Sequence, residues 1–393
     1  MRCFLRGSAG YVGASDGWQD FARNGRMTYS FDRAENGNVA LMGQAGASSG
    51  VLGLGFSHTP EGARTLAACS LAQGFEAARA RFVAGWERWA KTLRLPAATS
   101  LGAAMADEAY LSGVMLKVHE DRTFPGAVVA SLSVPWGNSS DSLGGYHLVW
   151  TRDAVESGFG LLAVGQREDA ERLLAYLAST QLPDGHWYQN FYPDGRPFWR
   201  GVQLDEAGFP ILLAAKLLED GATGLRGTRD MVRRAAAYIA SSGPGTPQDR
   251  WEENAGDSPF TLAVEVAALV AGGAMLGGQE GAYALSLADY WNERIEEWCY
   301  VRDTQLARNL GVPGYYARIA PPGGRGVAGR VELRNRAGEM RDTDELVGLE
   351  FMALSRFGLR RADDPRIVDS LKVADAVLRV DTPSGPLYHR YNG

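Results

Sequence analysis

From about residue 100 to the end of the chain, apolar residues recur at helical spacing in one segment after another. Long loops rich in glycine and proline separate these segments, as is typical of an α-solenoid or α-barrel that carries its chemistry in the loops. The sequence therefore predicts a mainly α fold. The predicted helices are 101–119, 151–165, 167–181, 206–219, 228–242, 258–276, 279–298, 343–358 and 366–379. The separating loops are 133–146, 183–201, 243–257 and 313–330.

The first part of the chain has a different pattern, with short alternating segments punctuated by glycine. Strands are expected at 26–32, 39–43 and 51–56, with a turn at 35–38. Strands of this kind favour part of a β-sandwich, and the segment is too short for a complete one.

Helical spacing begins at residue 61 and continues to about residue 93, before Leu95-Pro96. This segment predicts a helical linker between the strands and the helical region. We therefore expect three regions, at 1–65 (the C-terminal portion of a β-sandwich), 66–96 (the linker) and 97–393 (the helical domain).

Composition excludes several function classes. The net charge of −6 comes without a basic stripe, which argues against nucleic acid or anionic lipid as a partner. Cys3, Cys69 and Cys299 are far apart and odd in number, so neither a disulfide framework nor a zinc motif is indicated. No apolar run approaches the length of a membrane span, and we expect no signal peptide in the first residues, because their apolar stretch is too short.

Trp251-Glu252-Glu253 is the most informative short stretch for function. Like charges repel and a large ring excludes water, so at least one of the two carboxyl pKa values should rise. A carboxylic acid that keeps its proton near neutral pH is suited to protonate a poor leaving group such as a sugar oxygen. The alternative is an acidic helix start, in which carboxylates meet the positive end of the helix dipole.

Two further clusters combine aromatic and acidic residues at a junction between loop and helix. In the first, Arg152 and Asp153 offer a forked donor and a two-oxygen acceptor for neighbouring hydroxyls, with Tyr146 and Trp150 as walls. The alternative here is a helix cap with a surface arginine.

The second cluster runs from Trp199 through Gln203 and Asp205 to Glu206, and its alternative is a polar helix start. Chance produces one such cluster easily and three less easily. The three clusters together favour a polar, aromatic-walled binding site.

Other chemistries fit poorly. The histidines lack metal-ligand spacing, and no nucleophile elbow, Walker loop or dinucleotide-binding fingerprint occurs. Ser139-Ser140-Asp141-Ser142 is expected to be a loop without a base nearby. The histidines considered, each expected to be structural or on the surface, are His119, His147, His186 and His389.

The clusters resemble glycoside hydrolase family 15, the glucoamylase and glucodextranase family. The segment Tyr146 to Asp153 resembles the part that grips the non-reducing glucose, and Trp199 to Asp205 resembles the tryptophan-bearing substrate loop. Glu252 matches the family's general acid and Glu253 a neighbouring substrate-binding carboxylate. The ending, His389 to Gly393, resembles the family's Arg-Tyr loop, whose arginine, Arg390 here, contacts substrate.

The resemblance extends to the start of the chain, where Gly10 to Asp20 is similar to the tail of the β-sandwich domain that precedes the barrel in prokaryotic members. It implies an (α/α)6 barrel and hydrolysis with inversion. Two carboxyl groups then stand roughly 6.5–9.5 Å apart, leaving room for a water. Glu252 would protonate the glycosidic oxygen, a second glutamate would activate the water, and Tyr146 would help to seat it. The product would be β-glucose from the non-reducing end of an α-glucan or starch-type substrate.

The chain departs from the family pattern at its end. The family's general base lies beyond the Arg-Tyr loop, so it is expected beyond Gly393, and about nine predicted helices are fewer than the barrel needs. Asp344 and Glu345 match nothing catalytic and are expected on a solvated face. The chain therefore resembles a fragment that lacks both ends, and we expect little or no hydrolysis from it.

Several alternatives stay open. Activity on α-1,6 linkages or on trehalose shares the same glucose subsite, and a non-catalytic carbohydrate-binding fragment would keep Arg152, Asp153 and Trp199. A third class is an α-barrel lyase or phosphorylase. No cofactor is expected; Ca²⁺ occurs in some relatives, but no ligand loop is assignable here. The resemblance favours a secreted or periplasmic location, and the sequence leaves the oligomeric state open.

Overall fold

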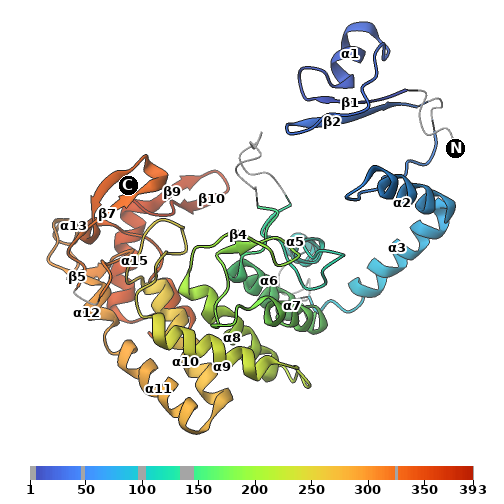
Figure 1. The fold of residues 1–393 in the computed structure, drawn as a ribbon. Helices are drawn as coiled ribbons and strands as arrows, with labels where there is room; N and C mark the ends of the chain where they lie inside the picture. Colours follow the sequence, from blue (N-terminus) through green and yellow to red (C-terminus); the bar gives the residue numbers. More distant parts are fainter. Residues whose placement is uncertain (1–5, 46–48, 96–102, 133–145, 324–325, 393) are drawn as a thin grey trace. The chain divides into compact units, whose positions relative to one another are not determined.

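The computed structural model describes residues 6–45, 49–95, 103–132, 146–323 and 326–392. The chain forms two compact units, one of residues 1–93 with 134–145 and one of residues 94–133 with 146–393 (Figure 1). Cys3, Ser139-Ser140-Asp141-Ser142 and all of the predicted loop 133–146 except Tyr146 lie outside the described residues. The predicted boundaries at residues 65 and 96 stay a prediction.

The described residues of the first unit form two strands and three helices. Its two strands pair antiparallel, with Arg6 opposite Gln44 and Tyr11 opposite Val39. Asp16 begins the first helix, because its carboxylate accepts a hydrogen bond from the backbone of Trp18. The elements are β1 (Arg6–Tyr11), α1 (Gly17–Asn24), β2 (Val39–Gln44), α2 (Pro60–Ala72) and α3 (Phe75–Ala90).

Two of the three predicted strands in this unit are wrong. Residues 26–32 form no strand, because Asp20 on α1 accepts hydrogen bonds from the backbone of Thr28 and Tyr29 and holds the segment against the helix. Residues 51–56 also form none. A Cβ on Gly55 would lie 2.0 Å from the carbonyl oxygen of Ala63, so this segment packs closely on α2. The strand predicted at 39–43 is confirmed as β2.

The predicted helix 61–93 is two helices, α2 and α3. They separate at Gly74, whose φ of 82° lies in the left-handed region that glycine adopts without steric cost. A residue in that conformation ends the regular hydrogen-bonding pattern. The prediction that this segment is helical is therefore correct, but the prediction of one continuous helix is wrong.

The second unit is mainly helical, which confirms the predicted fold class at this level. Its helices are α5 (Ala103–Val118), α6 (Thr151–Ala163), α7 (Arg167–Thr180), α8 (Leu204–Glu219), α9 (Thr228–Ser242), α10 (Pro259–Leu276), α11 (Gly278–Asn292), α12 (Ile295–Cys299), α13 (Gln305–Leu310), α14 (Met352–Arg356) and α15 (Pro365–Leu378), with 3₁₀ turns η2 (Arg334–Arg336) and η3 (Thr343–Glu345).

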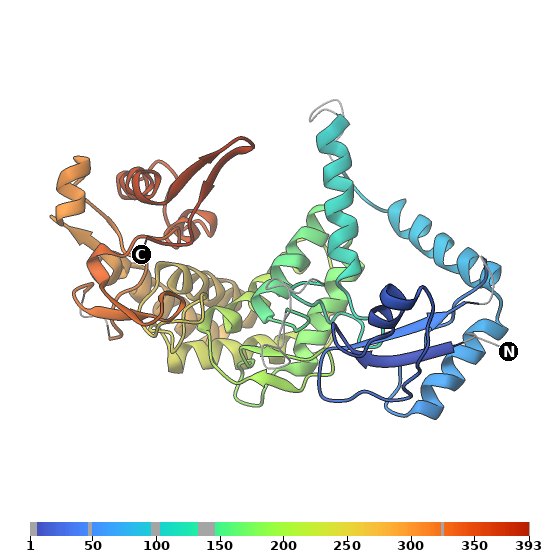
Figure 2. The same cartoon turned by 90° about the horizontal axis from the view of Figure 1, so that it is seen from above.

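Short antiparallel pairs of strands connect these helices. In Figure 2 the last of them follows α15 at the red end of the chain. The strands are β3 (Asn190–Phe191), β4 (Pro197–Trp199), β5 (Tyr300–Arg302), β6 (Gly314–Tyr316), β7 (Arg330–Leu333), β8 (Glu339–Asp342), β9 (Arg379–Thr382) and β10 (Gly385–Tyr388).

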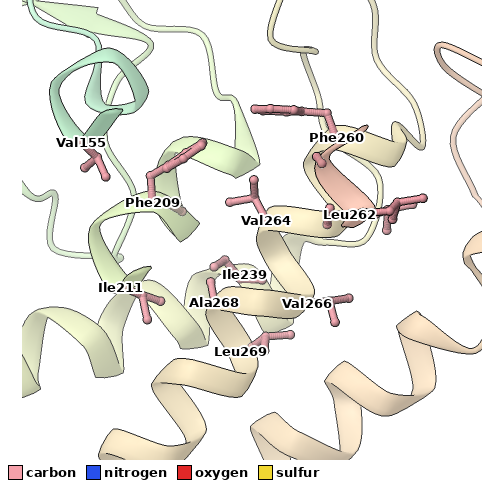
Figure 3. Close-up of a cluster of buried hydrophobic side chains, with 14 of the residues drawn as sticks. Val155, Phe209, Ile211, Ile239, Phe260, Leu262, Val264, Val266, Ala268 and Leu269 are labelled. Atoms are coloured by element: carbon pink, nitrogen blue, oxygen red, sulfur yellow. The ribbon is translucent and has the colours of Figure 1, made fainter. Parts of the chain in front are cut away.

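The helices α6, α8 and α10 pack side by side, and α7 and α9 each contact two of these three. This arrangement gives an inner and an outer row of helices. Figure 3 shows the core between them, where Val155 of α6, Phe209 of α8 and Phe260 of α10 are buried in one cluster. The rings of Phe209 and Phe260 lie 6.2 Å apart. The N-termini of α6, α8 and α10 lie at the same end of this row. Residues just before each of these helices can therefore meet there.

Two predicted helices differ from the structure. The segment 279–298 is interrupted between α11 and α12. The segment 343–358 is helical only at η3 and α14, because the backbone between them pairs with other segments. Leu346 accepts a hydrogen bond from the backbone of Arg318, and Gly348 forms a bridge with Tyr391. The predicted loop 313–330 contains strand β6.

Helix α10 contradicts the expectation that no apolar run approaches the length of a membrane span. It has 18 residues with a mean hydropathy of 1.7, enough by length and composition to cross a membrane. In the structure 72% of it is buried inside the protein, and a buried core helix satisfies the same criterion. Its apolar character follows from contacts with α8, α9 and α11 around it.

Candidate active site

A short hairpin brings the first two aromatic clusters together. Val149, just before α6, exchanges backbone hydrogen bonds of 2.8 and 3.0 Å with Phe191 on β3. Asn190 on β3 pairs with Trp199 on β4. The Trp150 ring consequently lies 6.4 Å from the Trp199 ring, edge to face, and 5.5 Å from the Tyr146 ring, stacked. Trp150 is buried and Trp199 is 39% exposed, so the exposed ring of Trp199 lies next to the buried ring of Trp150.

The first turns of α6 and α8 contribute a buried ion pair. Nη1 of Arg152 lies 2.9 Å from Oδ2 of Asp205 and donates a second hydrogen bond to Oε1 of Gln203. Burial lowers the pKa of the Arg152 guanidinium, but the charges of Asp205 and Glu206 outweigh it, and the pKa is raised overall. Asp153 stands beside this pair, with Oδ2 3.8 Å from Nη2 of Arg152 and its side chain 46% exposed.

Glu252 lies in a tight turn rather than at a helix start. The carboxylate of Asp249 accepts backbone hydrogen bonds from Glu253 at 2.9 Å and Asn254 at 3.2 Å, which closes the loop on itself. Helix α10 begins seven residues after Glu252, at Pro259. The alternative interpretation of an acidic helix start is therefore wrong.

The backbone of Glu252 is unusual, with a φ of 66°. A non-glycine residue in the left-handed region costs free energy, and such residues cluster at functional sites. The carboxyl is held in place from across the unit, because Nε1 of Trp150 donates a 2.8 Å hydrogen bond to Oε1 of Glu252. The turn thus presents Glu252 to the aromatic cluster.

Glu253 points into a buried network instead. Its Oε2 lies 2.9 Å from Nη2 of Arg318, and its Oε1 accepts a 3.1 Å hydrogen bond from the hydroxyl of Tyr391. Arg318 is fully buried and also contacts Asp249 and Asn254. Burial raises the pKa of Asp249 even though Arg318 opposes the shift. The predicted substrate contact of Glu253 stays a prediction, and the structure gives this residue protein partners.

Trp251 connects the turn to the end of the chain. Its Nε1 donates a 2.6 Å hydrogen bond to Oε1 of Glu350, and the guanidinium of Arg390 lies 4.6 Å from its ring centroid. Asn392 fixes this end segment, because its backbone donates to Val347. Arg390 therefore contacts the loop of Glu252, and its predicted contact with substrate stays a prediction.

Glu206 is fully buried behind the Arg152 pair. Its Oε1 lies 3.8 Å from Nη1 of Arg152, and neither carboxyl oxygen has a hydrogen-bond partner among the described residues. Burial raises the pKa of Glu206 well above its usual range, the Arg152 charge opposes the shift, and Asp205 adds to it.

The predicted site residues thus meet at one end of the helical unit, linked directly or through Trp251. Arg250, Arg318 and Glu350 were not singled out from the sequence, and Glu206 was named only as the end of the second cluster. Glu206 and Arg250 stand next to motif residues, so proximity in sequence was an available signal. Arg318 and Glu350 lie in segments that were predicted to be a loop and a helix, and no local pattern marks them.

Three of the histidines have ordinary structural contacts. His119, His147 and His186 have partners at Met115, Leu132 and Asp184. In the part of the chain that the structure describes, no group of three or more His, Cys, Asp or Glu residues is arranged to hold a metal ion. The prediction that no cofactor is needed stays a prediction.

Two sequence families match the chain. Glycosyl hydrolases family 15 matches residues 104–185 and 177–392, and the family described as "Glucodextranase, domain N" matches residues 2–91. The first match covers most of the helical unit and includes all three clusters.

Individual relatives agree with the family matches. A glucoamylase from Clostridium sp. (strain G0005) is 33% identical over 399 residues, which cover 98% of this chain and 54% of that protein. An uncharacterized glycosyl hydrolase from Methanocaldococcus jannaschii is 30% identical over 162 residues, covering 39% of this chain and 24% of that protein.

The crystal structure of a bacterial glucoamylase complexed with acarbose superimposes with a TM-score of 0.81 at 31% identity, covering 99% of this chain and 57% of that one. This match confirms the predicted (α/α)6 barrel-type fold. The chain spans about half the length of the two glucoamylases that it resembles.

Proposed function

The chain belongs to glycosyl hydrolase family 15, and on that premise we propose that it is an exo-acting, inverting α-glucosidase of the glucoamylase type. Its substrate would be an α-glucan oligosaccharide or starch-type chain, and its product β-glucose from the non-reducing end. The observation that carries the proposal is the Trp150–Glu252 hydrogen bond, which holds a carboxyl on a strained turn against Trp150, whose ring contacts that of Trp199.

In this mechanism Glu252 donates its proton to the glycosidic oxygen as the bond to the anomeric carbon breaks. Arg152, Asp153 and Gln203 provide donors and acceptors for the sugar hydroxyls, and Trp199 covers an apolar sugar face. A second carboxylate takes a proton from the water that attacks the opposite face. Both steps are proton transfers, so the mechanism needs no cofactor.

We place the general base outside the carboxylates of this cluster. Asp205 is paired with Arg152, Glu253 with Arg318, and Glu350 accepts from Trp251. A carboxylate committed to a buried cation is a weak acceptor for a proton from water. Without a base, the rate falls by roughly 10²–10⁴-fold, so residues 1–393 on their own would bind an α-glucan and hydrolyse it slowly.

Calorimetric titration with acarbose tests the binding part of this proposal. The wild-type chain should bind, and Arg152→Met should lose most of the affinity. Glu219→Gln serves as the control, because Glu219 forms an exposed pair with Lys216 on α8. Absence of measurable binding by the wild-type chain to both acarbose and maltotriose would contradict the function.

Turnover tests the chemical part. Glucose release from maltotriose should be slow in the 393-residue chain, faster in a longer protein that supplies the base, and lost from that protein in Glu252→Gln. Proton NMR of the first product formed should show the β-anomer. Near-normal turnover by Glu252→Gln would remove Glu252 as the acid.

A second candidate specificity is supported by the first unit, which matches "Glucodextranase, domain N". An enzyme for α-1,6-linked glucans would use the same acid and the same glucose subsite. Parallel assays on maltotriose and isomaltotriose separate the two specificities, and we expect the α-1,4 substrate to be preferred.

A further inference from the structure

Arg250 occupies a distinctive place beside the candidate acid. It directly precedes Trp251 in the turn that carries Glu252, and its side chain is partly buried. The guanidinium lies 4.5 Å from the Trp251 ring centroid and 4.2 Å from that of Phe260, at the start of α10. Two aromatic rings therefore contact the guanidinium.

The N–H groups of Arg250 have no partner among the described residues. Among the residues that the structure describes, none accepts a hydrogen bond from Arg250 or forms an ion pair with it. Arg152 and Arg318 differ, since each is paired with a buried carboxylate. A guanidinium carries five N–H donors in a planar fork, and stacking on rings uses its faces rather than its N–H edges.

The environment of Arg250 opposes its charge. Burial lowers the pKa of Arg250; the carboxylate of Glu350 offsets part of this effect, and the nearby Arg152 adds to it. A guanidinium nevertheless stays protonated in proteins. No nitrogen of Arg250 is among the fully buried polar atoms that lack a partner in the described residues, so its N–H groups are accessible to a ligand that brings acceptor oxygens.

The neighbouring charges restrict the kind of ligand. Glu350, Asp205 and Asp153 all act on Arg250 electrostatically, and they would repel an anion that approached it. Neutral hydroxyl oxygens accept hydrogen bonds from a guanidinium without that repulsion. On the premise that the chain binds α-glucans, we propose that Arg250 is a substrate-binding residue that donates hydrogen bonds to hydroxyl oxygens of the saccharide held beside Glu252.

Substitution distinguishes this role from packing. Arg250→Met keeps an unbranched apolar stem against Trp251 and Phe260 but removes every donor, whereas Arg250→Lys keeps the charge without the planar fork. We expect Arg250→Met to weaken acarbose binding by at least about tenfold, which corresponds to about 1.4 kcal/mol. The affinity of Arg250→Lys for acarbose should lie between those of Arg250→Met and wild type.

The matched control is Arg302→Met, because Arg302 also stacks on an aromatic ring, that of Tyr300 on strand β5. This control should bind acarbose like wild type. If Arg250→Met also binds within twofold of wild type, while Arg152→Met loses binding, the role of Arg250 is refuted and the proposed function stands. If wild type itself does not bind, both are refuted.

A second measurement uses the unaltered protein and does not depend on the folding of a variant. The guanidinium reagent phenylglyoxal is applied with and without saturating acarbose, and modified positions are identified by mass spectrometry. Acarbose should slow the modification of Arg250 several-fold and leave that of Arg302 unchanged. Equal rates at Arg250 in both conditions would overturn the proposal.

Discussion

At the scale of single residues, the site depends on contacts that combine burial with charge. Asp205 and Arg152 illustrate this, because neither is exposed enough for water to replace its partner. A buried ion pair adds little net stability, but removing one partner leaves an uncompensated charge. The pair therefore orders the site more than it stabilises the fold.

Asp205→Asn should consequently destabilise the helical unit by about 3 kcal/mol, measured by urea denaturation at pH 7. The control is Asp220→Asn, whose carboxylate lies 3.9 Å from Arg167 at the surface. That change should cost under about 0.5 kcal/mol. Equal effects of the two substitutions would show that the Arg152 pair is effectively solvated.

Glu206 gives a prediction about pH. Burial raises its pKa in the folded protein above the unfolded value, with Arg152, Asp205, Asp153 and Glu252 as the charges around it. The folded state then binds the proton more readily than the unfolded state. The stability from this group is complete below the unfolded pKa and falls as pH rises towards the folded pKa.

Glu206→Gln should therefore reduce the loss of stability between pH 5 and pH 8, measured as urea midpoints at both values. Part of the slope should persist, because burial also raises the pKa of Glu265 and Glu350. The surface variant Glu219→Gln should keep the full slope. A slope in Glu206→Gln as steep as in wild type would contradict the assignment.

At the scale of secondary-structure elements, the β3–β4 hairpin positions one aromatic wall. Asn190 is fully buried, and its Oδ1 accepts a 2.8 Å hydrogen bond from the backbone of Trp199. This contact adds a side-chain anchor to the short pairing between the strands. Trp199 itself stays partly exposed, so its orientation depends on the backbone beneath it.

Asn190→Ala should lower stability by about 1–2 kcal/mol and weaken acarbose binding, because Trp199 loses its anchor. Urea denaturation and calorimetric titration measure the two effects. Asn309→Ala provides the control, since Asn309 makes an exposed side-chain hydrogen bond with Gln305. Unchanged affinity in Asn190→Ala would mean that the hairpin holds Trp199 without this side chain.

At the scale of the whole chain, two compact units lie in one sequence. Units with separate cores often unfold separately, so one unfolding free energy need not describe the chain. Asp20 supports the first unit through hydrogen bonds from Thr28 and Asn24, and Asp205 supports the second.

Differential scanning calorimetry should accordingly show two transitions. Asp20→Asn should lower the temperature of one and Asp205→Asn that of the other, with little effect across units. Saturating acarbose should raise only the transition that Asp205→Asn lowers, because ligand stabilises the unit that binds it. A single transition moved equally by both variants would show that the units unfold together.

Local sequence was sufficient for most helices of the second unit. Predicted and observed bounds of α9 agree, and those of α6, α7, α10 and α15 differ by about one or two residues. The local sequence was not sufficient where contacts with residues distant in sequence decide the conformation. Residues 343–358 have a helical pattern, but pairing with Arg318 and Tyr391 keeps residues 346–348 out of a helix and divides the segment into η3 and α14.

The sequence by itself determined the helical periodicity and the three aromatic–acidic clusters, because side-chain spacing and turn residues act over a few positions. Only the tertiary structure decided which of those residues meet. Trp150 and Glu252 are 102 positions apart yet share a hydrogen bond, and Glu253 is directed to Arg318. Arg250 stacks on two rings, and its N–H groups have no acceptor among the described residues. Packing of α6, α8 and α10 into one row sets these contacts, and no local pattern encodes that packing.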